Sequence, residues 1–147
     1  MQKLKVKKLV EKAKLPSYGT PYSAGADLYA CLDLPFCTID AGKTEFVHTG
    51  ISMAIPEGFV GLIYARSGLA CKKGLAPANK VGVIDSDYRG EIIVALHNHG
   101  DEQRRIDDGE RIAQIVITPY ISVDYEESKD LDDTVRGEGG FGSTGKK

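Results

Sequence analysis

The chain has 147 residues, and its 19 Lys and Arg against 21 Asp and Glu give a formal net charge of −2. This length suits one domain with a single core. The slightly acidic balance argues against a nucleic-acid-binding module, which would carry a basic stripe. The hydrophobic fraction of 41% and the charged fraction of 27% exclude a wholly disordered chain.

The three cysteines, Cys31, Cys37 and Cys71, are odd in number and have no CxxC spacing. This pattern is typical neither of a secreted disulfide framework nor of a zinc ribbon. We therefore expect buried or half-buried thiols in a reducing cytosol, and a cytoplasmic location. The basic N-terminus has no apolar stretch behind it, and the longest apolar run, Ile92–Leu96, is too short to cross a bilayer. No membrane partner is expected.

Short apolar segments divided by turn residues recur along the chain and predict an all-β sandwich or barrel. Leu4 and Val6 alternate with lysines, as on a half-exposed edge strand. One short helix is predicted over Ser67–Gly74, with Ser67 as its N-cap and Gly74 at its end. The other predicted strands are Ala26–Cys31, Thr44–Thr49, Ile51–Ile55, Val60–Ala65, Glu91–His97, Arg111–Ile117 and Tyr120–Tyr125.

The segment Ala65–Ala70 joins a predicted strand to this helix. Arg66 supplies a fixed charge, and the amides of Ser67, Gly68 and Leu69 at a helix start would favour a phosphate or an oxyanion. The alternative is a surface arginine beside an ordinary helix cap.

A second polar cluster follows the apolar run Val81–Ile84. Asp85 and Asp87 share one face of an extended chain. Asp85 comes directly after the strand, so it is the better candidate for an oriented general base. The alternative is a pair of turn-forming aspartates at a hairpin.

Gln114 stands inside an otherwise apolar predicted strand, where its amide must be hydrogen-bonded. It could serve the structure, or it could orient a water or a phosphate. His97 and His99 share a face near a strand end, but two histidines are too few for a zinc site.

The C-terminal part changes in composition. Asp124–Asp133 holds six acidic residues and one lysine, and Arg136–Gly145 holds five glycines. Composition alone favours a disordered tail, but an arginine, a phenylalanine and a Ser-Thr pair favour a lid over something anionic and planar. Gly140–Lys146 matches seven positions of a Walker A loop, but the eighth is Lys147 instead of Ser or Thr, so no P-loop is predicted.

These segments, taken in order, resemble the five motifs of the trimeric deoxyuridine triphosphate nucleotidohydrolases (dUTPases). The resemblance covers nearly the whole chain. It implies a β-jelly-roll subunit over residues 1–135, a homotrimer with active sites at subunit contacts, and a flexible lid over residues 136–147. The matching segments are Ala24–Ala30, Ala65–Ala70, Gly82–Gly90, Gly109–Gln114 and Arg136–Gly145.

The reaction that the resemblance implies is hydrolysis of dUTP to dUMP and diphosphate, by Mg²⁺-assisted attack of water on the α-phosphorus. Such an enzyme keeps uracil out of DNA and supplies dUMP for thymidylate synthesis. Asp85 resembles the water-activating base, and Gln114 the residue that holds the water or the phosphate chain. Arg66 and Arg136 would offset phosphate charge. Asp27 would reach the metal through its water shell, a mode that suits Mg²⁺.

The resemblance also implies how the nucleoside is selected. The hairpin Asn79–Ile84 and the strand near Ile93 would hold uracil, Tyr88 would pack under the deoxyribose, and Phe141 would stack on the base. Lys80 departs from the apolar residue expected beside Asn79. The remaining expected substrate contacts are Ser67, Gly68, Gly82, Val83, Asp85, Gly142 and Ser143.

Two other functions remain open from the residues. A dCTP deaminase of the same superfamily has a glutamate three positions before the asparagine that closes the strand, and Ala95 takes that place here. A non-catalytic nucleotide-binding module of this fold would not need Asp85, Gln114 and Arg136 together.

Overall fold

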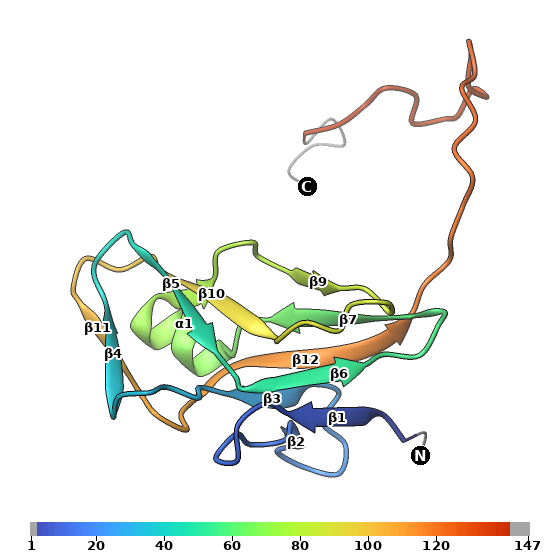
Figure 1. Ribbon diagram of the computed structural model, residues 1–147. Helices are drawn as coiled ribbons and strands as arrows, with labels where there is room; N and C mark the ends of the chain where they lie inside the picture. Colours follow the sequence, from blue (N-terminus) through green and yellow to red (C-terminus); the bar gives the residue numbers. More distant parts are fainter. Residues whose placement is uncertain (1–2, 142–147) are drawn as a thin grey trace.

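The structure is a computed structural model that describes residues 3–141 (Figure 1). These residues form twelve short strands and one helix, which confirms the all-β prediction. The strands are β1 (Lys5–Lys8), β2 (Ser17–Tyr18), β3 (Ala26–Tyr29), β4 (Phe36–Ile39), β5 (Thr44–His48), β6 (Ile51–Ala54), β7 (Phe59–Tyr64), β8 (Leu75–Pro77), β9 (Gly82–Ile84), β10 (Ile93–Asn98), β11 (Arg104–Asp107) and β12 (Arg111–Pro119), and the helix is α1 (Ser67–Lys73).

All strand pairs are antiparallel, and the arrangement is a jelly-roll-like sandwich. The largest sheet has the order β2-β3-β12-β7-β9, and a second sheet has the order β5-β10-β8. Two further pairs, β1-β6 and β11-β4, complete the architecture. Because β12 lies between β3 and β7, its residue Gln114 stands opposite both Asp27 and Tyr64. This register brings three predicted motifs to one place.

One apolar core joins the sheets. Along β10, alternate residues are buried, as expected for a strand with one face on the core. Among the described residues, the buried polar side chains are those of Thr49, Ser52 and Asn98, and Asn98 lies at the end of β10. Asn98 donates to the carbonyls of Ile39 and Glu102, so its burial is compensated.

The N-cap of the helix α1 lies one residue earlier than predicted. Arg66 is its N-cap, with an extended backbone at φ −86° and ψ 130°, and no side chain caps the first turn. The prediction that Ser67 is the cap is therefore wrong, and Ser67 is the first helical residue. Gly74 ends the helix with φ 68° in the left-handed region, as predicted.

The segment Tyr120–Tyr125 was predicted as a strand and is not one, because β12 ends at Pro119. From Tyr120 to Tyr125 every residue is exposed. Figure 1 shows this orange segment leaving the sandwich and running away from it. An alternating pattern forms a strand only where an edge is available to pair with it.

The cysteines differ in exposure. Cys31 and Cys37 are half-buried, but Cys71 on α1 is exposed, contrary to the expectation for all three. All three are free. Burial raises the pKa of the Cys31 and Cys37 thiols, which keeps them protonated and poorly reactive. Within residues 3–141 no helix has both the length and the apolar character needed to span a bilayer.

Candidate active site

A pocket of about 430 Å³ lies where β3, β12 and the start of α1 meet. We call it the phosphate pocket. Five residues that the sequence singled out line it together, although they come from three separate motifs. Its lining is Gly19, Ser23, Ala24, Gly25, Asp27, Arg66, Ser67, Gly68, Arg111 and Gln114.

Two arginines hold the carboxylate of Asp27 in this pocket. Arg66 Nε donates to Asp27 Oδ1 at 2.8 Å, and Arg111 donates through Nη1 to Oδ2 at 3.2 Å. The Asp27 side chain is only 13% exposed, against 26% for Arg66 and 52% for Arg111. Two cations against one carboxylate leave a net positive charge at the pocket wall, which favours an anionic ligand.

Sequence reasoning missed Arg111. It lies in the motif that ends at Gln114, and the strand pairing shifts by one residue between Arg111 and Ala113. Such a bulge breaks the simple alternation of side chains along a strand. Only the charge of Arg111 at the start of an otherwise apolar strand could have signalled its position in the site.

Gln114 is half-buried and hydrogen-bonded, as predicted from its place in the strand. Its Nε2 donates to the carbonyl of Ala65 at 2.9 Å, immediately before the helix cap. Its side chain packs so closely over Gly25 that a Cβ there would overlap the amide. The amide therefore has a fixed orientation, with Nε2 committed to the chain and Oε1 beside Gly25.

A second pocket, of about 240 Å³, lies between β9 and β10. We call it the nucleoside pocket. It contains predicted site residues from the third motif and from the following strand. Its lining is Val83, Ile84, Asp85, Tyr88, Glu91 and Ile93.

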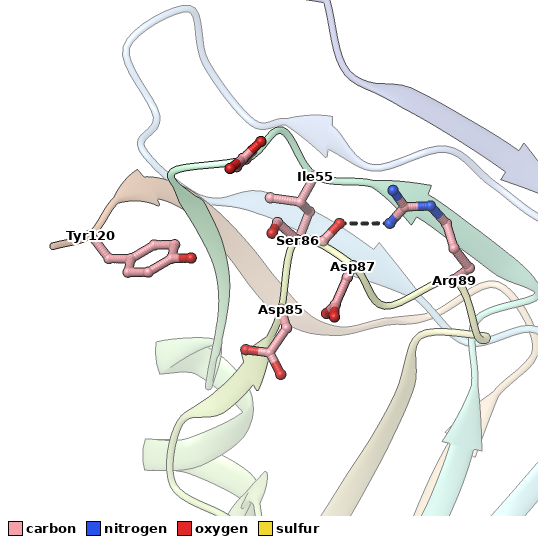
Figure 2. Close-up of a pocket in the computed structure, with 7 residues that line it drawn as sticks. Ile55, Asp85, Ser86, Asp87, Arg89 and Tyr120 are labelled. Carbon is pink, nitrogen blue, oxygen red and sulfur yellow. Dashed lines mark hydrogen bonds between the residues drawn. The ribbon is translucent and has the colours of Figure 1, made fainter. Parts of the chain in front are cut away.

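The residues of this pocket are more exposed than the sequence indicated. Val83 on β9 is 60% exposed, and Asp85 is also exposed. The apolar run before Asp85 is therefore not a buried strand, because β9 is the edge strand of its sheet and pairs only with β7. Asp85 and Asp87 also line a wider depression of about 580 Å³ with Tyr120 (Figure 2). Arg89 closes this turn by donating to the carbonyls of Ser86 and Tyr88 at 2.6 and 2.9 Å.

Asn79 and Gly82 lie beside the nucleoside pocket instead of in its lining. Asn79 lies in the turn between β8 and β9, which belong to different sheets, and Gly82 is the first residue of β9. The Asn79 amide nitrogen would stand 3.3 Å from a Cβ on Gly82. Lys80 between them has φ 65°, in the left-handed region. A lysine with this backbone conformation is strained.

The tail residues are far from both pockets in the described chain. Arg136 donates from Nε to the carbonyl of Gly139 at 2.8 Å, within a local turn. Phe141 is fully exposed, and Figure 1 shows its segment away from the sandwich. The other two predicted tail contacts, Gly142 and Ser143, lie outside the described residues.

A resident metal site is not built from protein side chains in residues 3–141, where no three His, Cys, Asp or Glu residues come together. Asp27 accepts one arginine on each carboxylate oxygen. Its remaining lone pairs suit contact with a hydrated ion better than direct ligation. The donor set therefore fits Mg²⁺ only if phosphate and water oxygens supply its inner shell.

His97 and His99 do share a face, with ring centroids 4.4 Å apart. Thr44 hydrogen-bonds to His97 Nδ1 at 2.8 Å, and Lys80 Nζ lies 3.4 Å from His99 Nε2. Partial burial, the Lys80 charge and His97 lower the pKa of His99. This pair is a local polar cluster without a third metal ligand among the described residues.

Comparisons with known proteins agree along the whole chain. The dUTPase family model matches residues 11–145. A deoxyuridine 5'-triphosphate nucleotidohydrolase of Rickettsia bellii is 51% identical over 143 residues, covering 97% of this chain and 95% of the relative. One from Desulfitobacterium hafniense is 53% identical, covering 90% of this chain and 87% of the relative.

Solved structures give the same result. The dUTPase of Staphylococcus bacteriophage 80alpha with dUPNHPP has a TM-score of 0.89 and 28% sequence identity, covering 99% of each chain. The G164S mutant of that enzyme with dUpNHpp has a TM-score of 0.88 and 27% identity. The five ordered motifs, the antiparallel sandwich and the matches over nearly the full length lead to one conclusion: the chain belongs to the dUTPase family.

Proposed function

We propose that the chain carries out the reaction of its family, hydrolysis of dUTP to dUMP and diphosphate, in a site completed between subunits of a homotrimer. One observation carries the assembly part of this proposal. The phosphate pocket and the nucleoside pocket have no lining residue in common within the described chain. This separation supports a site in which the nucleotide bridges the phosphate pocket of one subunit and the nucleoside pocket of another, facing each other across a subunit contact.

The phosphate pocket would hold the triphosphate. Arg66 and Arg111 supply fixed positive charge, and Ser67 and Gly68 are exposed at the start of α1. A nucleoside triphosphate carries nearly four negative charges, which would repel an attacking hydroxide unless they are offset. Bound Mg²⁺ would neutralise part of that charge, with Asp27 in contact with its water shell.

Asp85 would take the proton from the attacking water. It is an exposed carboxylate between the nucleoside pocket and the depression of Figure 2, so it is open to substrate and to water. The Gln114 amide is fixed by its Nε2, and among the described contacts its Oε1 accepts no hydrogen bond from the protein. It can therefore orient the water or a phosphate oxygen from the opposite pocket.

The nucleoside pocket would select uracil and deoxyribose. Val83, Ile84 and Ile93 give it an apolar wall, and main-chain groups near Asn79 and Gly82 would read the edge of the base. In the completed site, a tight wall would exclude the methyl group of thymine. Tyr88 under the sugar would clash with a 2′-hydroxyl, which excludes UTP.

Residues 136–147 would act as a lid, and residues 1–135 as the β domain. Arg136 and Phe141 are both exposed in this structure and are free to approach a bound nucleotide. In the proposed closed state Arg136 contacts phosphate, Phe141 stacks on uracil, and Gly142 and Ser143 add main-chain and hydroxyl donors. The free thiols and the proposed nucleotide substrate are consistent with an enzyme of the reducing cytoplasm.

The test is a product assay on the purified full chain with dUTP and Mg²⁺. Diphosphate and dUMP in equal amounts are expected, with dTTP, dCTP and UTP as poor substrates. With dCTP as substrate, release of ammonia would instead indicate a deaminase. Binding of dUTP without any product would indicate a nucleotide-binding module.

A further inference from the structure

The side chain of Glu91 links the nucleoside pocket to a distant turn of the sandwich. Glu91 comes between β9 and β10, and it accepts the N–H of Gly50 on Oε1 at 2.8 Å. Its Oε2 lies 2.9 Å from Nδ1 of His48 at the end of β5. The Glu91 side chain is 22% exposed, against 56% for His48. The better-buried bond, from Gly50 N–H to the carboxylate, is therefore the stronger anchor.

Tyr88 is tied to the same residue from the other side. Its hydroxyl donates to the main-chain carbonyl of Glu91 at 2.9 Å. Its ring lies across Gly90 so closely that a Cβ there would overlap the ring. The plane of the Tyr88 ring is thus set by the main chain of Gly90 and Glu91.

The chain beyond Glu91 is held independently. Ile92 donates its N–H to the carbonyl of Ile51 at 2.8 Å, and Thr49 donates its hydroxyl to the carbonyl of Ile92. These bonds do not involve the Glu91 side chain. Because the Ile92 N–H shares a peptide plane with the Glu91 carbonyl, these bonds also hold the acceptor of the Tyr88 hydroxyl. Removing the Glu91 side chain therefore loosens the turn at Gly90, against which the Tyr88 ring packs, without detaching β10.

We propose that Glu91 is a positioning residue for sugar selection, which holds the Tyr88 ring so that it cannot yield to a 2′-hydroxyl. This rests on the proposed packing of Tyr88 against deoxyribose. Rejection of an extra hydroxyl by contact alone requires a rigid wall, because a wall that can shift accommodates the larger ligand. The anchor from the Gly50 N–H to the Glu91 carboxylate supplies that rigidity through the backbone of Gly90 and Glu91.

The experiment measures kcat/KM for dUTP and for UTP in the full chain and reports their ratio. Glu91→Ala is expected to lower this ratio by about tenfold, in the range of one lost steric or hydrogen-bonding constraint. Glu91→Gln keeps an acceptor for Gly50 and is expected to hold the ratio within about twofold of the unmodified chain. If Glu91→Ala does not fold, Glu91→Asp replaces it, because the shorter side chain cannot reach both Gly50 and His48.

Asp108→Asn is the matched control. Asp108 also accepts a main-chain N–H from another segment, that of Leu32 at 2.8 Å, and it also lies near a cation, Lys12 at 3.4 Å. Its variant should lower thermal stability slightly and leave the dUTP to UTP ratio unchanged. A change in the ratio for Asp108→Asn as large as for Glu91→Ala would mean that general destabilisation is responsible, and would overturn the inference.

A double variant separates the inference from the proposal on which it rests. Tyr88→Phe has no hydroxyl to donate to the Glu91 carbonyl. In that background, Glu91→Ala should lower the dUTP to UTP ratio of kcat/KM by less than about twofold. If Tyr88→Ala relaxes the ratio but Glu91→Ala does not, the role of Glu91 is wrong and that of Tyr88 stands. If Tyr88→Ala leaves the ratio unchanged, both roles are wrong.

Discussion

The two pockets are built by different means. In the phosphate pocket, side chains from three elements hold one another, as Arg66 and Arg111 do with Asp27. In the nucleoside pocket, β9 lies at a sheet edge, and Val83 and Asp85 face outward without cover. The first pocket is fixed by contacts within one chain, whereas the second is lined largely by exposed residues. This difference predicts distinct responses to mutation and to mixing of subunits.

The largest expected effect is at Asp85. Asp85→Asn keeps the shape of the side chain but cannot accept a proton from water. Turnover should fall by at least about 10²-fold, the usual range for loss of a general base. Steady-state kinetics gives the loss, and binding of a non-hydrolysable dUTP analogue should be retained. Near-normal turnover would assign the base to another residue.

Deletion of residues 136–147 should separate catalysis from stability. The segment from Tyr120 to Phe141 is exposed apart from Gly139, so the described part of the deleted segment contributes nothing to the core. The deletion should leave the melting temperature nearly unchanged. Turnover should fall by about tenfold or more, and dUTP affinity by less, because the lid contacts act mainly on the closed state. Limited proteolysis supplies the second readout. A tail cut equally fast with and without an analogue and Mg²⁺ would contradict the lid.

Mixing two inactive chains tests whether the pockets come from different subunits. Asp85→Asn damages the nucleoside pocket and Arg66→Gln damages the phosphate pocket. After refolding an equal mixture, about a quarter of the sites should draw both pockets from undamaged chains. Activity should recover in that proportion. No recovery in trimers verified as mixed by native mass spectrometry would place each whole site within one chain.

The smallest expected effect concerns stability in acid, away from both pockets. The N–H of Leu32 and, less strongly, Lys12 lower the pKa of Asp108, while partial burial opposes them. A carboxylate whose pKa is lower in the folded than in the unfolded state stabilises the fold above its unfolded value, near 3.9, and loses that effect as pH falls through the folded value. The difference in melting temperature between the unmodified chain and Asp108→Asn should therefore be present at pH 7 and disappear at low pH. A difference that persists in acid would mean that charge is not its cause.

The sequence predicted what depends on local pattern. Gln114 was identified because an amide inside an apolar strand must be bonded, and the end of α1 because Gly74 adopts a left-handed backbone. Two predictions failed because tertiary pairing decides them. Tyr120–Tyr125 finds no strand edge in the described chain, and the cap of α1 is Arg66, whose side chain binds Asp27.

Long-range contacts of the site could not be predicted from local pattern. Glu91 reaches Gly50 and His48, which are 41 and 43 positions away in the sequence. Arg111 reaches Asp27 over 84 positions, across a bulge. Contacts of this kind depend on the order of strands in the sheets, which composition and periodicity do not encode.

The exposed chain that follows β12 has one more consequence. From Tyr120 to Val135 it is a tether that carries Arg136 and Phe141. A tethered group meets its target at an effective concentration set by tether length, on the order of millimolar for a short flexible linker. That concentration falls only slowly as residues are added. If residues 136–147 form the proposed lid, a weak pair of contacts is therefore enough to close it frequently over a bound nucleotide and still let it open to release the products.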